Sequence, residues 1–186
     1  MKKQRKNAGF SLIEMMCALL IMVLLVMAIG VGMDAGSKIY RDATFESESA
    51  TLAGILNTSL GDILRYSSYL RATTVEERAE NGTDAEFVFT SIDYGIQDAY
   101  FYTPPHEDGS YKGTLQMKNF RNSRTVELVN SGAYPDLTVS NFKITYKPRT
   151  KPGVDGGYFT ITYDIFSETD ASKVRNVQTI VRLMND

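Results

Sequence analysis

The residue types that could do chemistry gather at the N-terminus of the chain. A basic head comes first, the small Gly9 precedes the large apolar Phe10, and one carboxylate, Glu14, stands four residues after Phe10. The basic residues of the head are Lys2, Lys3, Arg5 and Lys6. An acid beside a long apolar run is costly in a membrane unless it lies at the interface or meets a positive group. The chemistry to explain is therefore that of Glu14.

The run that positions Glu14 extends from Met15 to Met33 and contains no charged residue and no proline. Its 19 residues would form a helix about 28 Å long, against a hydrocarbon core of about 30 Å. The run therefore predicts a membrane-spanning helix, extended on the near side to residues 10–33. The basic head stays in the cytoplasm by the positive-inside rule, so the C-terminal part is expected outside.

The segment Ala8-Gly9-Phe10-Ser11-Leu12-Ile13-Glu14 resembles the N-terminal signal of type IV prepilins and of the related pseudopilins of type II secretion and DNA-uptake systems. The resemblance implies a prepilin peptidase that cleaves after Gly9 and methylates the new terminus at Phe10, so residues 1–9 would be a cleaved leader. An ordinary secretory signal is cut after its apolar segment, whereas Gly9 lies before it. The other partners implied are pilins or pseudopilins in a helical filament, an inner-membrane assembly platform and membrane lipid.

Glu14 has more than one explanation. Cleavage after Gly9 would create a positive partner, the α-amino group of Phe10, and two unit charges 4 Å apart attract by about 4 kcal/mol at an effective dielectric of 20. In the family, the glutamate at this position pairs between subunits, and Glu14 matches it. The alternatives are an interfacial acid without function, or an ordinary single-pass protein in which Gly9-Phe10 and Glu14 occur by accident.

Composition narrows the remaining classes. Loss of residues 1–9 would change the formal net charge from −2 (20 basic and 22 acidic residues) to −6 (16 and 22), which gives no support for a nucleic-acid-binding face. The one cysteine, Cys17, lies in the apolar run, so the outer part is expected to fold without a disulfide. The one histidine, His106, follows two prolines in a turn. No catalytic site, metal site or cofactor is predicted, and the chain is not expected to be an enzyme.

The helix is expected to continue past the membrane to about Leu70, because no proline interrupts it. From Ala53 onward, apolar or small residues recur every three or four positions, as on one buried helix face. They are Ala53, Leu56, Leu60, Ile63 or Leu64, and Ser67. The helix should be weakened near Gly30, Gly32 and Gly36, each of which costs about 1 kcal/mol relative to alanine.

The small residues Ala28, Gly32 and Gly36 are spaced by four and share a helix face. They indicate either close packing of a neighbouring helix or a joint between the span and the outer half, and both are compatible with the sequence.

After a capping-box pattern at Thr74–Glu77, the apolar period changes from that of a helix to that of strands. The expected strands are 86–90, 99–103, 114–117, 125–129, 137–146, 157–166 and 174–184. The last three should form an antiparallel meander, with a turn at 151–157 between the first two of them. The fold class is α+β: a long N-terminal helix whose second half, 34–72, packs on an antiparallel sheet in 73–186, in a pilin-like roll.

Two classes of function follow. The first is a structural subunit of a filament, processed by prepilin peptidase and displayed outside the cell. The second is a membrane-tethered or tip-proximal binding module of the same machinery, whose loops contact a surface, DNA or secreted cargo.

Overall fold

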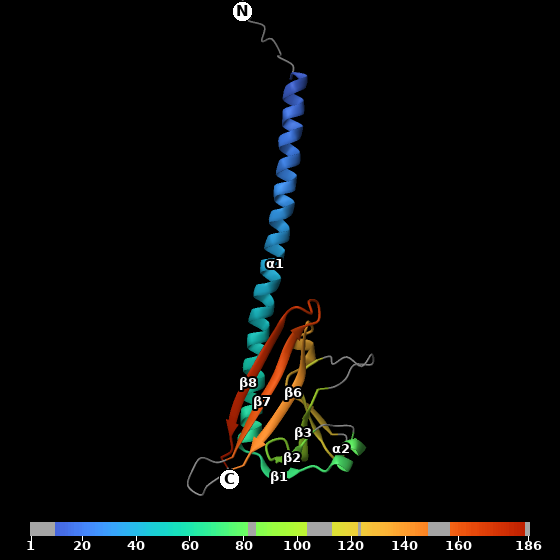
Figure 1. Ribbon diagram of the computed structural model, residues 1–186, viewed down its shortest axis with the longest axis vertical. Helices are drawn as coiled ribbons and strands as arrows, with labels where there is room; N and C mark the ends of the chain where they lie inside the picture. The colour runs from blue at the N-terminus through green and yellow to red at the C-terminus, as the bar shows by residue number, and fades with distance from the viewer. Residues whose placement is uncertain (1–9, 82–84, 104–112, 123, 149–156, 185–186) are drawn as a thin grey trace, which may run out of the picture. The chain divides into compact units, whose positions relative to one another are not determined.

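The long helix α1 (Leu12–Arg65) precedes every strand of the computed structural model (Figure 1). The structure describes residues 10–81, 85–103, 113–122, 124–148 and 157–184. The chain divides into two units, Met1–Thr44 and Phe45–Asp186. The basic leader, Gly9, His106 and residues 151–156 of the expected turn lie outside the described residues.

The first turn of α1 is capped by Ser11, and the helix runs without interruption through Gly30, Gly32 and Gly36. It ends at Arg65, five residues before the predicted end at Leu70. At this end, both the backbone N–H and the hydroxyl of Ser67 donate to the Leu64 carbonyl, at 3.3 and 2.9 Å. These bonds close the last turn of the helix. The chain then continues directly into a strand, residues 68–72, that the sequence analysis did not predict.

The expected strands all occur, with shifted ends, and their outcome confirms the α+β class. The elements after α1 are β1 (Ser68–Ala72), α2 (Val75–Asn81), β2 (Phe87–Ser91), β3 (Ile96–Tyr102), β4 (Gln116–Asn119), β5 (Thr125–Glu127), the 3₁₀ turn η1 (Ser131–Ala133), β6 (Leu137–Lys147), β7 (Tyr158–Ser167) and β8 (Val174–Arg182). In the described part of the chain they form two antiparallel sheets rather than one, β1-β2-β3-β4-β5 and β6-β7-β8. The predicted meander of the last three strands is confirmed.

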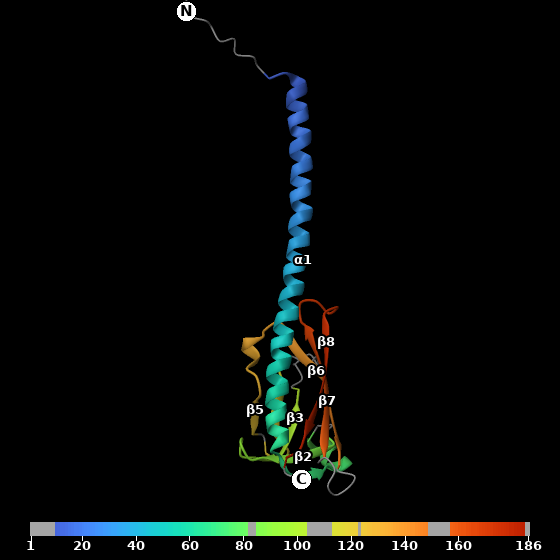
Figure 2. The ribbon, with the colours of Figure 1, turned by 90° about the vertical axis from the view of Figure 1, so that its left-hand side faces the viewer.

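The core of the second unit lies where the C-terminal turns of α1 meet both sheets (Figure 2). The predicted helix face from Ala53 onward is buried, with Leu56, Leu60 and Leu64 fully inaccessible to solvent. On β7, Phe159, Ile161, Tyr163 and Ile165 alternate with half-buried residues and face this core.

A buried polar contact fixes α1 on the three-stranded sheet. The hydroxyl of Tyr163 donates to Oδ1 of Asn57 at 3.0 Å, and the carbonyl of Ala53 lies 3.3 Å away as a second acceptor. Burial raises the pKa of the Tyr163 hydroxyl, so this donor keeps its proton. A second tie is the ion pair between Arg175 of β8 and Glu46 of α1, at 2.9 Å.

Candidate functional site

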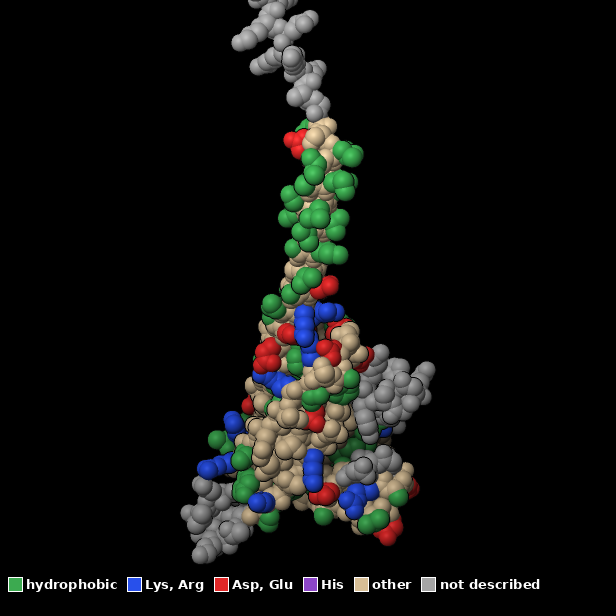
Figure 3. Space-filling view, turned by 45° about the horizontal axis from the view of Figure 1, so that its top comes forward, with side chains coloured by type: hydrophobic (Ala, Val, Ile, Leu, Met, Phe, Trp, Pro, Cys, Tyr) green, Lys and Arg blue, Asp and Glu red, His purple; other side chains and the backbone are tan. Residues whose placement is uncertain are grey.

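The first half of α1 has apolar side chains on every side and no contact that covers them. Every described residue from Phe10 to Ala43 is exposed. The helix is long and apolar enough to cross a membrane, by length and composition. Figure 3 shows hydrophobic side chains along this half of the helix, interrupted near its start by an acidic group. That group is Glu14, the one charged residue between Phe10 and Met33.

Glu14 and Ser11 form a reciprocal capping box at the start of α1. The backbone N–H of Ser11 donates to Oε2 of Glu14 at 2.8 Å, and the N–H of Glu14 donates to the Ser11 hydroxyl at 3.3 Å. Each residue thereby satisfies a donor that the first turn of a helix leaves without a partner. The bond also turns the carboxylate back toward the N-terminus, against the direction in which the apolar run extends.

This orientation decides which chemistry the carboxylate can perform. The Ser11 amide is the next backbone donor after that of Phe10, and it is the donor that the Glu14 carboxylate binds. The printed contact uses Oε2, and Oε1 can accept a further donor. A carboxylate placed in this way can hold an ammonium group at the N-terminus of its own or a neighbouring helix.

Gly32 and Gly36 of the expected packing face, and Gly30 beside them in the sequence, all have open space around them in the described subunit. A Cβ atom built on Gly30, Gly32 or Gly36 would meet no atom within 4 Å. Ala28, on the same face, is also exposed. Neither the contacts nor the backbone of the described subunit requires glycine at these three positions.

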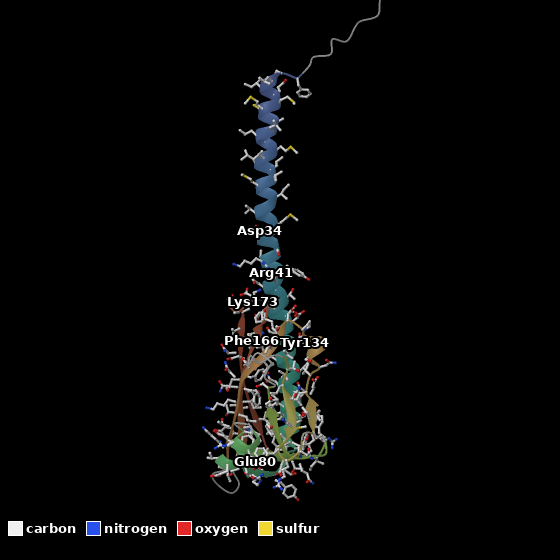
Figure 4. The ribbon with its side chains drawn as sticks, turned by 90° about the vertical axis from the view of Figure 1, so that its right-hand side faces the viewer. Asp34, Arg41, Glu80, Tyr134, Phe166 and Lys173 are labelled. Carbon is white, nitrogen blue, oxygen red and sulfur yellow. The ribbon has the colours of Figure 1, made fainter. Side chains whose placement is uncertain are left out.

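Charged residues resume on α1 directly after the uncharged run, which ends at Met33. Figure 4 labels Asp34, the first charged residue after Met33, and Arg41, about two turns further along the helix. Lys38 lies between them, and Ile39 and Tyr40 remain exposed to 68% and 74%. The C-terminal end of the uncharged stretch is therefore marked by charged residues, but apolar side chains continue beyond it.

The second unit shows no competing chemical site in its described residues. Across the described ranges, no group of three or more His, Cys, Asp or Glu residues could hold a metal ion. An ionic cluster joins Arg71 of β1 to Glu77 of α2 at 3.0 Å and Arg121 to Asp98 at 2.9 Å. Both ion pairs link surface elements to one another, so the cluster has a structural role.

Comparison with known families identifies the N-terminal segment. The family model described as the prokaryotic N-terminal methylation motif matches residues 4–30. The chain therefore carries a type IV prepilin-like signal, as the resemblance predicted. No curated protein and no solved structure matches the chain.

The motif supports a precursor of the pilin or pseudopilin type. It implies processing by prepilin peptidase and assembly with other pilins. Together with the long apolar helix it also indicates anchoring in a membrane.

Sequence reasoning missed one residue of this site. Ser11 and Glu14 have the same Ser/Thr-x-x-Glu spacing as Thr74 and Glu77, which was recognised and does cap α2, with bonds of 3.0 and 3.2 Å. The signal was therefore present in the sequence. The uncharged run after Glu14 hides this spacing, because it makes the residue stand out as a charge in a membrane rather than as a helix cap.

Proposed function

We propose that the chain is a structural subunit of a type IV pilus-like or type II secretion-like filament. Prepilin peptidase cleaves between Gly9 and Phe10 and methylates Phe10, and the mature subunit then enters the filament through the first half of α1. The basic leader, 1–9, keeps this end in the cytoplasm, while residues 34–186 face outward. An inner-membrane platform and the lipid bilayer are the further partners, and the assembled filament is extracellular.

Glu14 is the observation that carries this proposal. It is the one charge in the span, it lies inside the matched motif, and its carboxylate accepts from the N–H of Ser11, the residue after Phe10. After cleavage, the Phe10 nitrogen would become an ammonium group next to the Ser11 amide that Glu14 already binds. The carboxylate then has two possible cationic partners: the amine of its own chain and that of a neighbouring subunit.

Desolvation decides between these partners. A carboxylate and an ammonium in an apolar setting gain most when both are fully paired, and removal of one member of a buried pair costs about 3–5 kcal/mol. In a single helix the terminal residue frays, so its own amine is a poorly fixed partner. A neighbouring helix packed against Glu14 would hold an amine in place, and the pair would then report the axial register of the two subunits.

The test has two stages. Coexpression with a prepilin peptidase should shorten the chain by nine residues and leave methylated Phe10, as seen by mass spectrometry. Glu14→Val should then be processed and inserted as before, because the change makes the span more apolar. Its recovery in sheared filaments, at matched membrane expression, should fall sharply. An intact Met1 terminus, or equal recovery of both proteins, contradicts the proposal.

A specific observation supports the second class, a membrane-tethered or tip-proximal binding module. Five large apolar or aromatic side chains are exposed around the end of α1, and we call them the tyrosine patch: Tyr66, Tyr69, Ile92, Tyr94 and Met184. Their segments are joined by the pairing of Ser68 with Thr90 and by the bond from the Met184 N–H to the Arg65 carbonyl, at 3.0 Å.

Within the tyrosine patch, Tyr69 is 85% exposed and has a φ of 52°, a conformation that non-glycine residues rarely adopt. Exposed tyrosine and methionine are typical of contact surfaces. If the chain is a binding module, Tyr69→Ser should abolish contact with the surface, DNA or cargo and leave incorporation into filaments unchanged. Loss of incorporation instead would assign the patch to assembly.

A further inference from the structure

The three-stranded sheet has one face on the core and one face open to solvent. Alternate residues of β7, from Phe159 to Ile165, are buried in the core, so Tyr158, Thr160 and Thr162 project from the opposite face. Figure 4 shows side chains of the three strands that project away from α1, and several of them end in nitrogen. We call the side of β6, β7 and β8 on which Tyr158, Thr160 and Thr162 lie the outer sheet face.

Strand pairing puts cations beside an aromatic ring on the outer sheet face. Tyr158 lies directly opposite Lys147 of β6 and Arg182 of β8, and residues that lie opposite each other project from the same face. The Nζ atom of Lys147 lies 5.8 Å from the centroid of the Tyr158 ring, a cation–π contact. Further along the same strands, Lys143 lies opposite Thr162. The two lysines are about 13 Å apart along β6, and Lys147 and Arg182 are about 10 Å apart across the sheet.

The three strands differ in charge from the chain as a whole. β6, β7 and β8 contain four basic residues and one acidic residue, whereas the whole chain has 20 basic and 22 acidic residues. One of the four cations, Arg175, pairs with Glu46 of α1. The one carboxylate, Asp164, accepts from the amides of Asn141 at 2.7 Å and Asn176 at 2.5 Å, one on each oxygen. The outer sheet face therefore has an excess of positive charge.

Uncharged polar groups lie between the cations. Thr145 lies opposite Thr160, and Thr162 lies opposite Gln178. A hydroxyl group both donates and accepts hydrogen bonds, and an amide does so through separate atoms. Ile180, which is opposite Thr160 and 60% exposed, adds apolar surface beside them. The outer sheet face thus combines cations, hydroxyls, amides and an aromatic ring at the regular spacing of a sheet.

We propose that the outer sheet face binds an anionic polysaccharide, a chain of sugars that carry carboxylate groups. Lys143, Lys147 and Arg182 pair with the carboxylates in charge-assisted hydrogen bonds. The threonine and glutamine side chains exchange hydrogen bonds with sugar hydroxyls, and the Tyr158 ring packs against the apolar side of a sugar ring. A flat surface with a repeating pattern suits an extended ligand that itself repeats.

Charge density favours a polysaccharide over a nucleic acid. Duplex DNA carries one negative charge per about 1.7 Å of its axis, whereas the cations of the outer sheet face are about 10–13 Å apart. The chain as a whole is acidic and repels a ligand of such high charge density. A carboxylated sugar chain has fewer charges per unit length, and hydroxyl groups separate them. It therefore matches cations that are separated by threonine and glutamine.

The test measures binding of the full chain, purified in detergent, to polygalacturonate, a linear chain of carboxylated sugars. The same polymer with methyl-esterified carboxylates is the matched neutral ligand. We expect saturable binding to polygalacturonate that weakens with added salt. Binding to the neutral polymer should be at least about tenfold weaker, a difference of about 1.4 kcal/mol. Equal binding to both polymers, no binding to either, or tighter binding to a DNA duplex overturns the proposal.

A pair of charge variants locates the site. Lys143→Gln combined with Lys147→Gln should weaken binding to polygalacturonate about tenfold, since two cations of the outer sheet face are lost. The control combines Lys118→Gln with Arg124→Gln, which removes two cations next to β4 and β5 of the other sheet and should leave binding unchanged. Equal losses in both variants overturn the assigned face. Aggregation of the first variant with unchanged binding assigns the two lysines to protection of an edge strand and also overturns the proposal.

Two further positions should act in opposite directions. Tyr158→Thr removes the ring and should weaken binding about fivefold, whereas Tyr158→Phe keeps the ring and should bind like the unmodified chain. Threonine is favourable in strands, so the fold should persist, as an unchanged melting temperature would show. Asp164→Asn removes the one carboxylate of the outer sheet face and should strengthen binding. Weaker binding of Asp164→Asn at an unchanged melting temperature contradicts the charge argument.

The proposal and the filament function can fail separately. The outer sheet face belongs to the second unit, whereas Glu14 lies in the first. If the chain enters filaments in a Glu14-dependent manner but does not bind polygalacturonate, the proposed function stands and this inference falls. If it binds through Lys143 and Lys147 but does not enter filaments, this inference stands and the filament function falls.

Discussion

The charge of Glu14 and its capping role can be separated by one substitution. Glu14→Gln keeps an oxygen that accepts the Ser11 N–H, which lies at 2.8 Å from Oε2 in the structure, because glutamine serves as well as glutamate in a capping box. The substitution removes the negative charge but leaves the size of the side chain and its hydrogen-bond acceptor unchanged. The helix start should therefore persist, while the ammonium group of Phe10 loses its partner.

The expected magnitude follows from this partner. An ammonium group left buried without its carboxylate costs about 3–5 kcal/mol, and every 1.4 kcal/mol corresponds to a tenfold change in an equilibrium. Glu14→Gln should therefore lower incorporation into filaments by more than about a hundredfold. The matched variant is Ser11→Ala, which removes the hydroxyl that accepts the Glu14 N–H at 3.3 Å. Loss of a cap costs about 1 kcal/mol, so its incorporation should fall at most about fivefold.

Both variants would be compared at equal amounts of processed protein in the membrane, by quantifying the tagged subunit in sheared filaments. Processing itself is the internal control, since neither change touches Gly9 or Phe10. The reasoning is refuted if Glu14→Gln assembles as well as the unmodified chain. It is also refuted if Ser11→Ala is the more damaging of the two, since that order would make the cap, and not the charge, the feature that assembly requires.

The remaining predictions concern the second unit. A fragment of residues 36–186 should be soluble and monomeric and unfold cooperatively without oxidant, and a circular dichroism spectrum dominated by helix would contradict the fold. In this fragment, Gly157→Ala should lower the melting temperature by several degrees, because its Cβ would collide with the ring and hydroxyl of Tyr146 and overpacking costs about 1–3 kcal/mol. Gly61→Ala, whose Cβ meets nothing within 4 Å, should raise it, and the reverse order would show that the close approach is wrong. The pKa of Glu77 lies below its usual value, first through a hydrogen bond from the Thr74 N–H and then through Arg71, so its stabilising effect is present above pH 4.5 and is lost as the pH falls through the lowered pKa. The difference in melting temperature between the fragment and its Glu77→Gln form should shrink on acidification, and a difference that grows would contradict this.

Sequence alone determined the features that depend on local pattern. The uncharged run after Glu14 is long enough to span a membrane in any context, and the motif at its start is readable without a fold. Alternation at Phe142, Ile144 and Tyr146 in β6 and along β7 indicated both strands, because a period of two leaves one face apolar whatever lies against it. The buried face of α1 from Ala53 onward was equally readable from its spacing.

Tertiary structure decided what depends on partners distant in the sequence. α1 ends at Arg65 and not at Leu70 because the next residues pair with β2, as in the register of Ser68 with Thr90. Nothing in the residues 66–70 themselves excludes a helix, so only the availability of a neighbouring strand could settle the end. The division of the strands into two sheets, and the contact of Tyr163 with Asn57 across 106 residues, were likewise beyond local reasoning. The stabilising free energy of such pairings arises only when the folded chain brings both partners together, so it cannot be predicted from either segment alone.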